Sequence, residues 1–167
     1  MADWISAIAS LIATVTVVIA VSEYFAGRER RRRDSDRERR EQARQLTAWA
    51  ATIPVEGARR YGVVLSNTSG STFHDVEAEV VLFGESTSRP IRLSIIPPGR
   101  YWVEYTPSHS SGWEFPVERS VIEDEIRPYM MTDKYRVHRV TFTDNMGQRW
   151  QSDDHARLRE CMSTSTH

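Results

Sequence analysis

The stretch FHDVEAEVVLF, residues 73–83, sets the expected fold of this chain. In its middle, acidic and apolar residues alternate in the order Asp75, Val76, Glu77, Ala78, Glu79 and Val80. Alternation with a period of two places the two kinds of side chain on opposite faces of a β-strand. We therefore expect a strand of an antiparallel sheet, with one face in a core and the other in water.

Several other stretches of residues 58–160 resemble this one. β-Branched and aromatic residues alternate with polar ones in YGVVLSN (61–67), RPIRLSII (89–96), RYWVEYT (100–106), YRVHRVTFTD (135–144) and QRWQS (148–152). Turn-forming residues separate these stretches, as in NTSG, PPG and DNMG, where Gly147 is expected to adopt the left-handed conformation of a hairpin loop. Short strands without a convincing helix between them predict an antiparallel β-sandwich over residues 58–160, followed by a flexible tail, 161–167.

The segment from Pro107 to Asp133 interrupts this pattern. It lacks clean alternation and contains an acidic run near its end. We expect a long excursion with an irregular strand near Trp113 to Val117 or a short helix near Val121 to Ile126. Long loops on a rigid sandwich often carry binding sites, so this segment is the first candidate for a contact surface.

Aromatic and acidic residues of this excursion are the candidate partner contacts. Trp102 and Trp150 lie in predicted strands and are expected in the core, whereas Trp113, in an irregular segment, is the first aromatic candidate for an exposed anchor, with a place in the core as the alternative. The candidate contacts are Trp113, Phe115, Glu123, Asp124 and Glu125.

No motif in the chain predicts catalysis or a cofactor. Asp153, Asp154 and His155 carry groups that bind metals, but no second cluster with ligand spacing supports them, and a polar turn explains them better. The single cysteine, Cys161, lies close to the C-terminus and excludes an intramolecular disulfide, which suits a reducing compartment. We therefore expect no catalytic, cofactor or metal site and no enzymatic activity.

Residues 27–57 are expected to form a charged juxtamembrane helix or linker. Residues 28–44 contain nine arginines and five acidic residues, a net charge of +4. Acids and arginines recur three and four positions apart, as in Glu29 with Arg32 and Arg33, which favours a solvated helix. Arginines beside anionic lipid headgroups gain roughly 1 kcal/mol each. The expected membrane-surface contacts are Arg28, Arg30, Arg31, Arg32, Arg33, Arg37, Arg39 and Arg40.

The end of this linker contains an apolar stripe. Leu46, Trp49 and Ile53 recur at helical spacing, and Pro54 follows them. This spacing predicts a helical face that docks on the following domain or lies in the membrane interface, with the helix ending at the proline.

Residues 1–26 are expected to form a transmembrane helix. The stretch from Trp4 to Ala26 has 23 residues and a single charge, Glu23. A helix of that length reaches about 34 Å, enough to cross a hydrocarbon core of about 30 Å. A secretory signal would carry its basic residues before the apolar run, whereas here they follow it.

The distribution of basic residues predicts the orientation of this span. No lysine or arginine precedes it, and the arginine-rich segment follows directly. Basic residues stay on the cytoplasmic side of a membrane. We therefore expect a single-pass protein of the inner membrane, with its N-terminus outside and its C-terminal domain in the cytoplasm.

The ordered set of turns and apolar positions supports a resemblance to a family. Asn67-Thr68-Ser69-Gly70, Pro97-Pro98-Gly99 and Phe142-Thr143-Asp144, together with Trp150 and Leu158, resemble the immunoglobulin-like domain of small, mostly uncharacterised actinobacterial membrane proteins. The resemblance covers residues 60–160 and the plan of one span with a charged linker. It implies an immunoglobulin-like β-sandwich and brings no catalytic residue.

These features favour a membrane-anchored protein-interaction module, whose β-sandwich docks an unidentified protein partner at the inner membrane. Two alternatives remain open. The chain could be a structural or accessory subunit of a larger membrane assembly, or a membrane-tethered nucleic-acid binder that uses its arginines. Acids between the arginines and the absence of stacking aromatic residues there argue against nucleic acid. A homo-oligomer that packs through small residues of the span is compatible with the sequence.

Overall fold

The computed structural model describes residues 35–122 and 125–161. The chain forms two units, Met1–Arg40 and Glu41–His167, and every described strand belongs to the second. The expected transmembrane helix, residues 1–26, lies outside the described residues. Among the residues that are described, no helix is long and apolar enough to cross a membrane.

Residues 35–43 are helical, as expected for this part of the charged segment. The expected helix does not continue beyond them, because Leu46–Val55 is a β-strand, β1, that pairs along its whole length with β2, Ala58–Asn67. The prediction of a helical stripe through Leu46, Trp49 and Ile53 is therefore wrong. Ten antiparallel residue pairs with β2 outweigh the weak local preference of this apolar sequence. Pro54 is tolerated because β1 lies near the edge of its sheet.

The first sheet has the strand order β7-β6-β2-β1-β8. Its long strands are β1, β2 and β6, and β6 spans Gly99–Glu104. Two short strands flank them: β7 is Val117–Glu118 and β8 is Arg127–Pro128. All pairings are antiparallel, as predicted.

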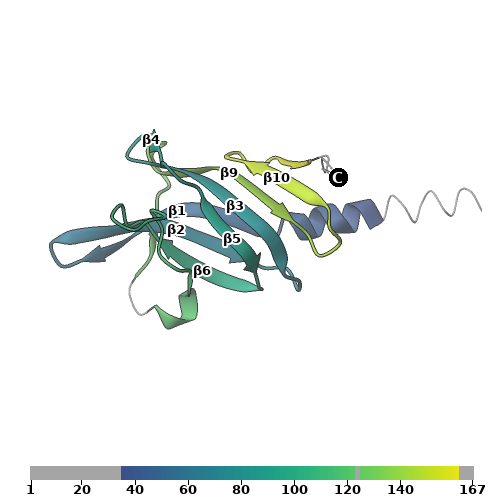
Figure 1. Ribbon diagram of the computed structural model, residues 1–167, viewed down its shortest axis with the longest axis horizontal. Coiled ribbons are helices and arrows are strands. Elements are labelled where there is room, and N and C mark those ends of the chain that lie inside the picture. The colour runs from purple at the N-terminus through teal and green to yellow at the C-terminus, as the bar shows by residue number, and fades with distance from the viewer. Residues whose placement is uncertain (1–34, 123–124, 162–167) are drawn as a thin grey trace, which may run out of the picture. The chain divides into compact units, whose positions relative to one another are not determined.

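The second sheet has the strand order β11-β10-β9-β3-β4, and β5 pairs with β3 on the same side as β4 (Figure 1). Its strands are β3 (Phe73–Leu82), β4 (Glu85–Ser86), β5 (Ile91–Ile96), β9 (Arg136–Thr143), β10 (Arg149–Asp153) and β11 (Leu158–Glu160). The six stretches that the alternation of residues predicted as strands all contain one. The fold is mainly β and consists of two antiparallel sheets.

The two sheets share a core. Side chains of β2 and β6, such as Leu65 and Val103, join those of β3, β9 and β10, such as Phe73, Phe142 and Trp150, in one buried cluster. The alternation predicted for residues 75–80 is confirmed, because the valines and alanine are buried and the acids are not. The arrangement is a β-sandwich, in which apolar faces of two sheets pack together.

Two buried polar side chains fix the turns at one end of the sheets. Asn67 Nδ2 donates hydrogen bonds to the carbonyl oxygens of Ser71 (2.8 Å) and Ile96 (2.9 Å). Asp144 accepts a hydrogen bond from Trp150 Nε1 at 2.9 Å. Gly147, with a φ of 82°, adopts the left-handed conformation that the sequence predicted.

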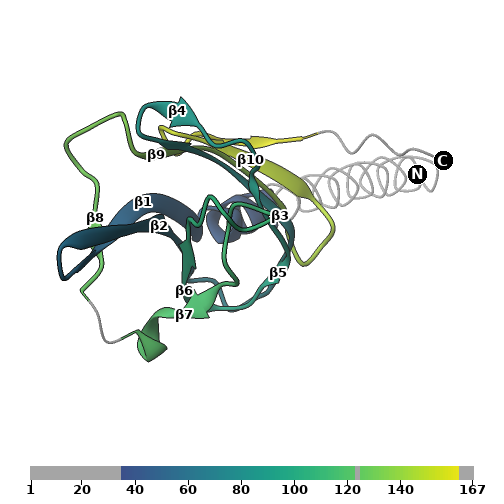
Figure 2. The ribbon, with the colours of Figure 1, turned by 60° about the vertical axis from the view of Figure 1, so that its left-hand side comes forward.

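The excursion between β6 and β9 crosses from one edge of the first sheet to the other (Figure 2). Its described residues include β7, a 3-10 turn at Arg119–Val121, and β8. Its Ile122 and Ile126 cover a second apolar cluster that includes Val64 and Trp102. The excursion thus adds a partial third layer to the sandwich.

Candidate functional site

An open groove of about 1120 Å³ lies along β5. One wall is β5 with the residues around it, and the other is the segment 113–116 that follows β6. Tyr101 and Val103 of β6 line it between these walls. A groove of this size with largely apolar walls is the kind of surface on which proteins bind other molecules.

The β5 wall is an edge of its sheet. β5 pairs with β3 on one side, and no described strand pairs with its other side. Ile91 and Ile96 at its ends are buried, whereas the side chain of Ile95 is 54% exposed. The wall therefore offers an exposed apolar residue beside a backbone whose outward N–H and C=O groups have no strand partner.

The opposite wall contains two of the predicted contact residues. The prediction that Trp113 is an exposed anchor is wrong: it is 5% exposed, and its ring lies 5.1 Å from that of Tyr105. Trp113 Nε1 donates to the carbonyl oxygen of Arg89 at 2.9 Å, and the Arg89 guanidinium donates to that of Ser110. These bonds tie the two walls together. Phe115 is 86% exposed, as a contact residue should be.

Tyr101 contributes a neutral hydroxyl to the groove. Burial and the nearby Glu118 carboxylate raise the pKa of its phenol. The hydroxyl donates a hydrogen bond of 3.4 Å to the carbonyl oxygen of Pro98. At neutral pH this residue therefore presents an uncharged ring.

The predicted acidic contacts do not join this groove. Glu123 and Asp124 lie outside the described residues. Glu125 is exposed and accepts a hydrogen bond of 2.8 Å from Arg127 in β8. This bond lowers the pKa of the Glu125 carboxyl. β8 flanks the edge of the sheet opposite to β7, so Glu125 is separated from the groove by the width of that sheet.

The predicted membrane-surface arginines are only partly described. Arg28 and Arg30 to Arg33 lie outside the described residues. Arg37, Arg39 and Arg40 belong to the helical residues 35–43, and Arg37 and Arg40 are exposed. Their contact with lipid remains a prediction.

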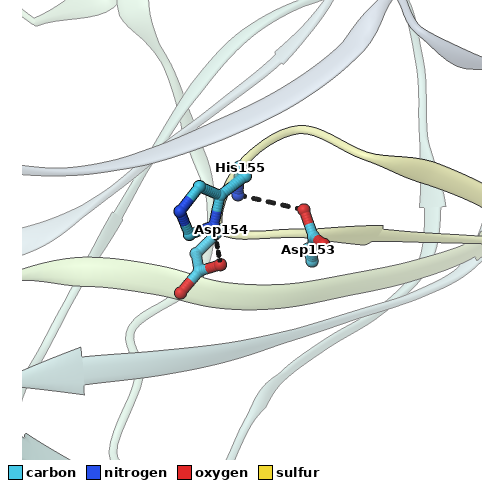
Figure 3. Close-up of side chains that lie close together, drawn as sticks. All are labelled: Asp153, Asp154 and His155. Atoms are coloured by element: carbon cyan, nitrogen blue, oxygen red, sulfur yellow. Dashed lines mark hydrogen bonds and ion pairs between the residues drawn. The ribbon is translucent and has the colours of Figure 1, made fainter.

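Asp153, Asp154 and His155 come together at the turn between β10 and β11 (Figure 3). Their potential ligand atoms lie within 4.8 Å of one another. Asp153 Oδ1 accepts hydrogen bonds from the backbone N–H groups of Arg157 (2.9 Å) and His155 (3.0 Å). The Arg157 bond is the main reason that the pKa of the Asp153 carboxyl is lowered. Asp153 therefore closes a turn.

The carboxylate of Asp154 contacts one arginine and two histidines, which are cationic when protonated. Its Oδ1 lies 2.6 Å from His155 Nδ1, and its Oδ2 lies 3.6 Å from His138 Nδ1 and 3.7 Å from Arg136 Nε. The His155 hydrogen bond is the largest cause of the lowered pKa of this carboxyl. An arginine beside a carboxylate competes with a metal ion for it. The contacts fit a surface ion-pair network, in line with the turn expected from the sequence.

Sequence reasoning missed Ile95 and the edge position of β5. The stretch RPIRLSII was predicted as a strand, but its place in the sheet depends on which strands pair, which alternation does not encode. The flanking residues Pro90 and Pro97-Pro98 do indicate an edge position, since prolines are common next to edge strands.

Comparison of the chain with models of protein families, with curated proteins and with solved structures finds no match.

Proposed function

We propose that this chain is a membrane-anchored, non-enzymatic protein-interaction module. Its β-sandwich would dock a partner protein in the groove between β5 and the segment 113–116. The observation that supports this best is that two large apolar residues among those that line the groove, Ile95 and Phe115, are exposed. Exposed apolar residues that line one concave surface are typical of interaction sites.

The anchoring part of the proposal rests on the sequence. The apolar stretch from Trp4 to Ala26 is long enough to span a membrane, and the arginines after it favour a cytoplasmic domain at the inner membrane. A span confines the domain to two dimensions and raises its effective concentration near other membrane proteins. Weak docking in a shallow groove then suffices.

We also infer that the sandwich is immunoglobulin-like. One sheet contains β1, β2 and β6, and the other contains β5, β3, β9 and β10 in that order. The chain changes sheet after β2, after β5 and after β8. Antiparallel sandwiches with such crossovers include the immunoglobulin-like domains, which commonly serve as interaction modules.

Site-specific photocrosslinking in the native membrane tests the docking proposal. A photoreactive side chain is placed at Phe115 or at Ile95, and the control position is Met146, an exposed residue of the turn before β10. We expect one protein of defined mass to be captured from the two groove positions and not from Met146.

A matched pair of variants sharpens this test. Phe115→Asp should abolish capture from Ile95, because a charge in an apolar contact is costly, while Met146→Asp should leave it unchanged. Equal capture from all three positions would contradict docking in the groove.

A further inference from the structure

Strand β5 has a longer unpaired edge than the other described edge strands of the two sheets. It is six residues long, so its free edge extends about 20 Å. The described edge strands β4, β7, β8 and β11 have two or three residues each. β1 is longer, but β8 covers its middle and Pro54 interrupts its edge. Proteins usually protect long edge strands, because a free edge is a template for pairing with another chain.

We propose that the groove takes an extended polypeptide segment of the partner, which pairs with β5 as an added strand. This inference rests on the proposed function above and names the form in which the partner binds. The outward N–H and C=O groups of β5 alternate along the edge, and only another extended backbone matches that alternation with hydrogen bonds. Addition of a strand to a sheet edge is an established mode of peptide recognition.

The side chains around the edge define the sequence that fits. Tyr101 and Val103 of β6 and Trp113 of the opposite wall all line the groove, so one face of the added strand meets an apolar surface. The exposed residues Ile95 and Phe115 line the two walls. Side chains of a strand alternate between its faces, so the bound segment has apolar residues at every second position.

Charges on the walls add a preference. Glu114 is exposed on the wall opposite β5 and makes no hydrogen bond or ion pair through its carboxylate with a described residue. Arg92 of β5 lies 3.3 Å from Glu77 on the solvent side of the sheet. The free carboxylate favours a segment with a basic residue on the side away from β5.

The experiment uses the full-length chain in lipid nanodiscs and a displayed library of short linear peptides. Peptides are selected against the wild type and counter-selected against Phe115→Asp. Amide hydrogen exchange is then measured with and without the best peptide. We expect selected peptides to alternate apolar and polar residues, and alternate amides of β5 to exchange at least about tenfold more slowly when the peptide is bound.

Single prolines on β5 provide the second readout. Neighbouring residues of a strand direct their N–H groups to opposite sides, so of Leu93→Pro and Ser94→Pro one removes a bond to β3 and the other blocks the free edge. Thermal unfolding identifies the edge-blocking variant as the one that retains its stability. That variant should bind the peptide at least about tenfold more weakly.

The outcomes separate the two proposals. If the peptide binds in the groove but β5 amides are not protected and the edge-blocking proline has no effect, strand addition is wrong and docking in the groove stands. A library that yields no peptide dependent on Phe115 also overturns strand addition, whereas photocrosslinking decides docking by itself.

Discussion

Gly62 illustrates how one residue without a side chain shapes this sandwich. A Cβ atom at this position would lie 2.4 Å from the carbonyl oxygen of Val103 and 2.7 Å from the indole of Trp102. The Trp102 ring therefore lies across the β2 backbone, a position that only glycine permits. The indole N–H is buried there without a hydrogen-bond partner among the described residues, so apolar packing alone holds the ring.

Gly62→Ala is expected to lower the free energy of unfolding by about 1–3 kcal/mol, because the added methyl group must displace Trp102 or the backbone of β6. Urea unfolding followed by tryptophan fluorescence measures the change. Gly70→Ala is the control, since no atom lies within 4 Å of the corresponding Cβ position. Equal stability of the two variants would contradict the close packing at Gly62.

Asp144 is a second position at which one side chain fixes local structure. Its Oδ2 accepts from Trp150 Nε1, and its Oδ1 accepts from the backbone N–H groups of Met146 and Gln148, each at 2.9 Å. Asp144→Ala leaves these donors without their acceptor, and we expect it to cost about 2–4 kcal/mol. Thermal unfolding checks this, with Asp133→Ala at an exposed position as the control. In a Trp150→Phe background the cost should be smaller, because one of the three donors is then absent.

Among the elements, β1 shows where reading the sequence succeeds and where it fails. The stretch after Phe73 was predicted as a strand because one of its faces meets the core and the other meets water. β1 is buried on both faces over residues 50–53, so its apolar residues follow no period of two and match a helical stripe equally well. Whether such an apolar stretch forms a helix or a strand depends on the strands available to pair with it, and the sequence of the stretch alone does not specify these.

Dependence on distant parts of the chain also explains why the burial of Trp113 at the groove was not predicted. Turn residues such as Gly147 are readable because a left-handed conformation demands particular residues. By contrast, the local sequence does not indicate whether an aromatic side chain in an irregular segment is exposed or buried. Trp113 is buried in the core cluster, where the carbonyl oxygen of Arg89, distant in sequence, accepts the hydrogen bond of its indole N–H, and Phe115 is exposed two residues later.

A fragment test follows from the role of β1. Residues 41–161 contain the whole sandwich, whereas residues 58–161, which begin where the sequence placed the domain, lack the strand that pairs with β2 over ten residues. We expect the longer fragment to unfold cooperatively and the shorter one to lack a cooperative transition, since the buried side chains of Leu46, Ala50 and Ile53 are lost. Circular dichroism during heating measures both. Cooperative unfolding of the shorter fragment would contradict a structural role for β1.

The turn between β10 and β11 predicts a dependence of stability on pH. The pKa of Asp153 is lowered from its ordinary value of 3.8 by hydrogen bonds from backbone N–H groups. A carboxyl whose pKa is lower in the folded state stabilises the fold above the unfolded pKa, and this contribution is lost as the pH falls through the folded value. Asp153→Asn keeps an acceptor oxygen but does not titrate.

Thermal unfolding of the wild type and of Asp153→Asn between pH 7 and pH 3 tests this dependence. The wild type should be the more stable at neutral pH, and the difference between the two midpoints should shrink below about pH 4. Because Asp153 is only partly buried, the effect should be small and should decrease further in high salt. A difference that stays constant over this range would contradict the assignment.

At the scale of the whole molecule, the proposed anchor and the proposed groove support each other. Strand addition along six residues gives few contacts, so it needs a high local concentration of the partner. A span would provide this by holding the domain at the membrane where the partner resides. We therefore expect the domain without its anchor to bind the partner only weakly in solution. The anchored chain should capture the partner more efficiently in the membrane.

The proposed anchor leads to the last prediction. The full-length chain should remain with membranes during extraction with alkaline carbonate, and a chain that lacks residues 1–26 should become extractable, because only a hydrophobic span resists this treatment. Orientation is tested with a membrane-impermeant maleimide on intact cells. The native Cys161, the sole cysteine, should be labelled only after permeabilisation, whereas Ala2→Cys in a Cys161→Ser background should be labelled directly. Labelling of Cys161 in intact cells would place the domain, and with it the groove and its partner, on the opposite side of the membrane.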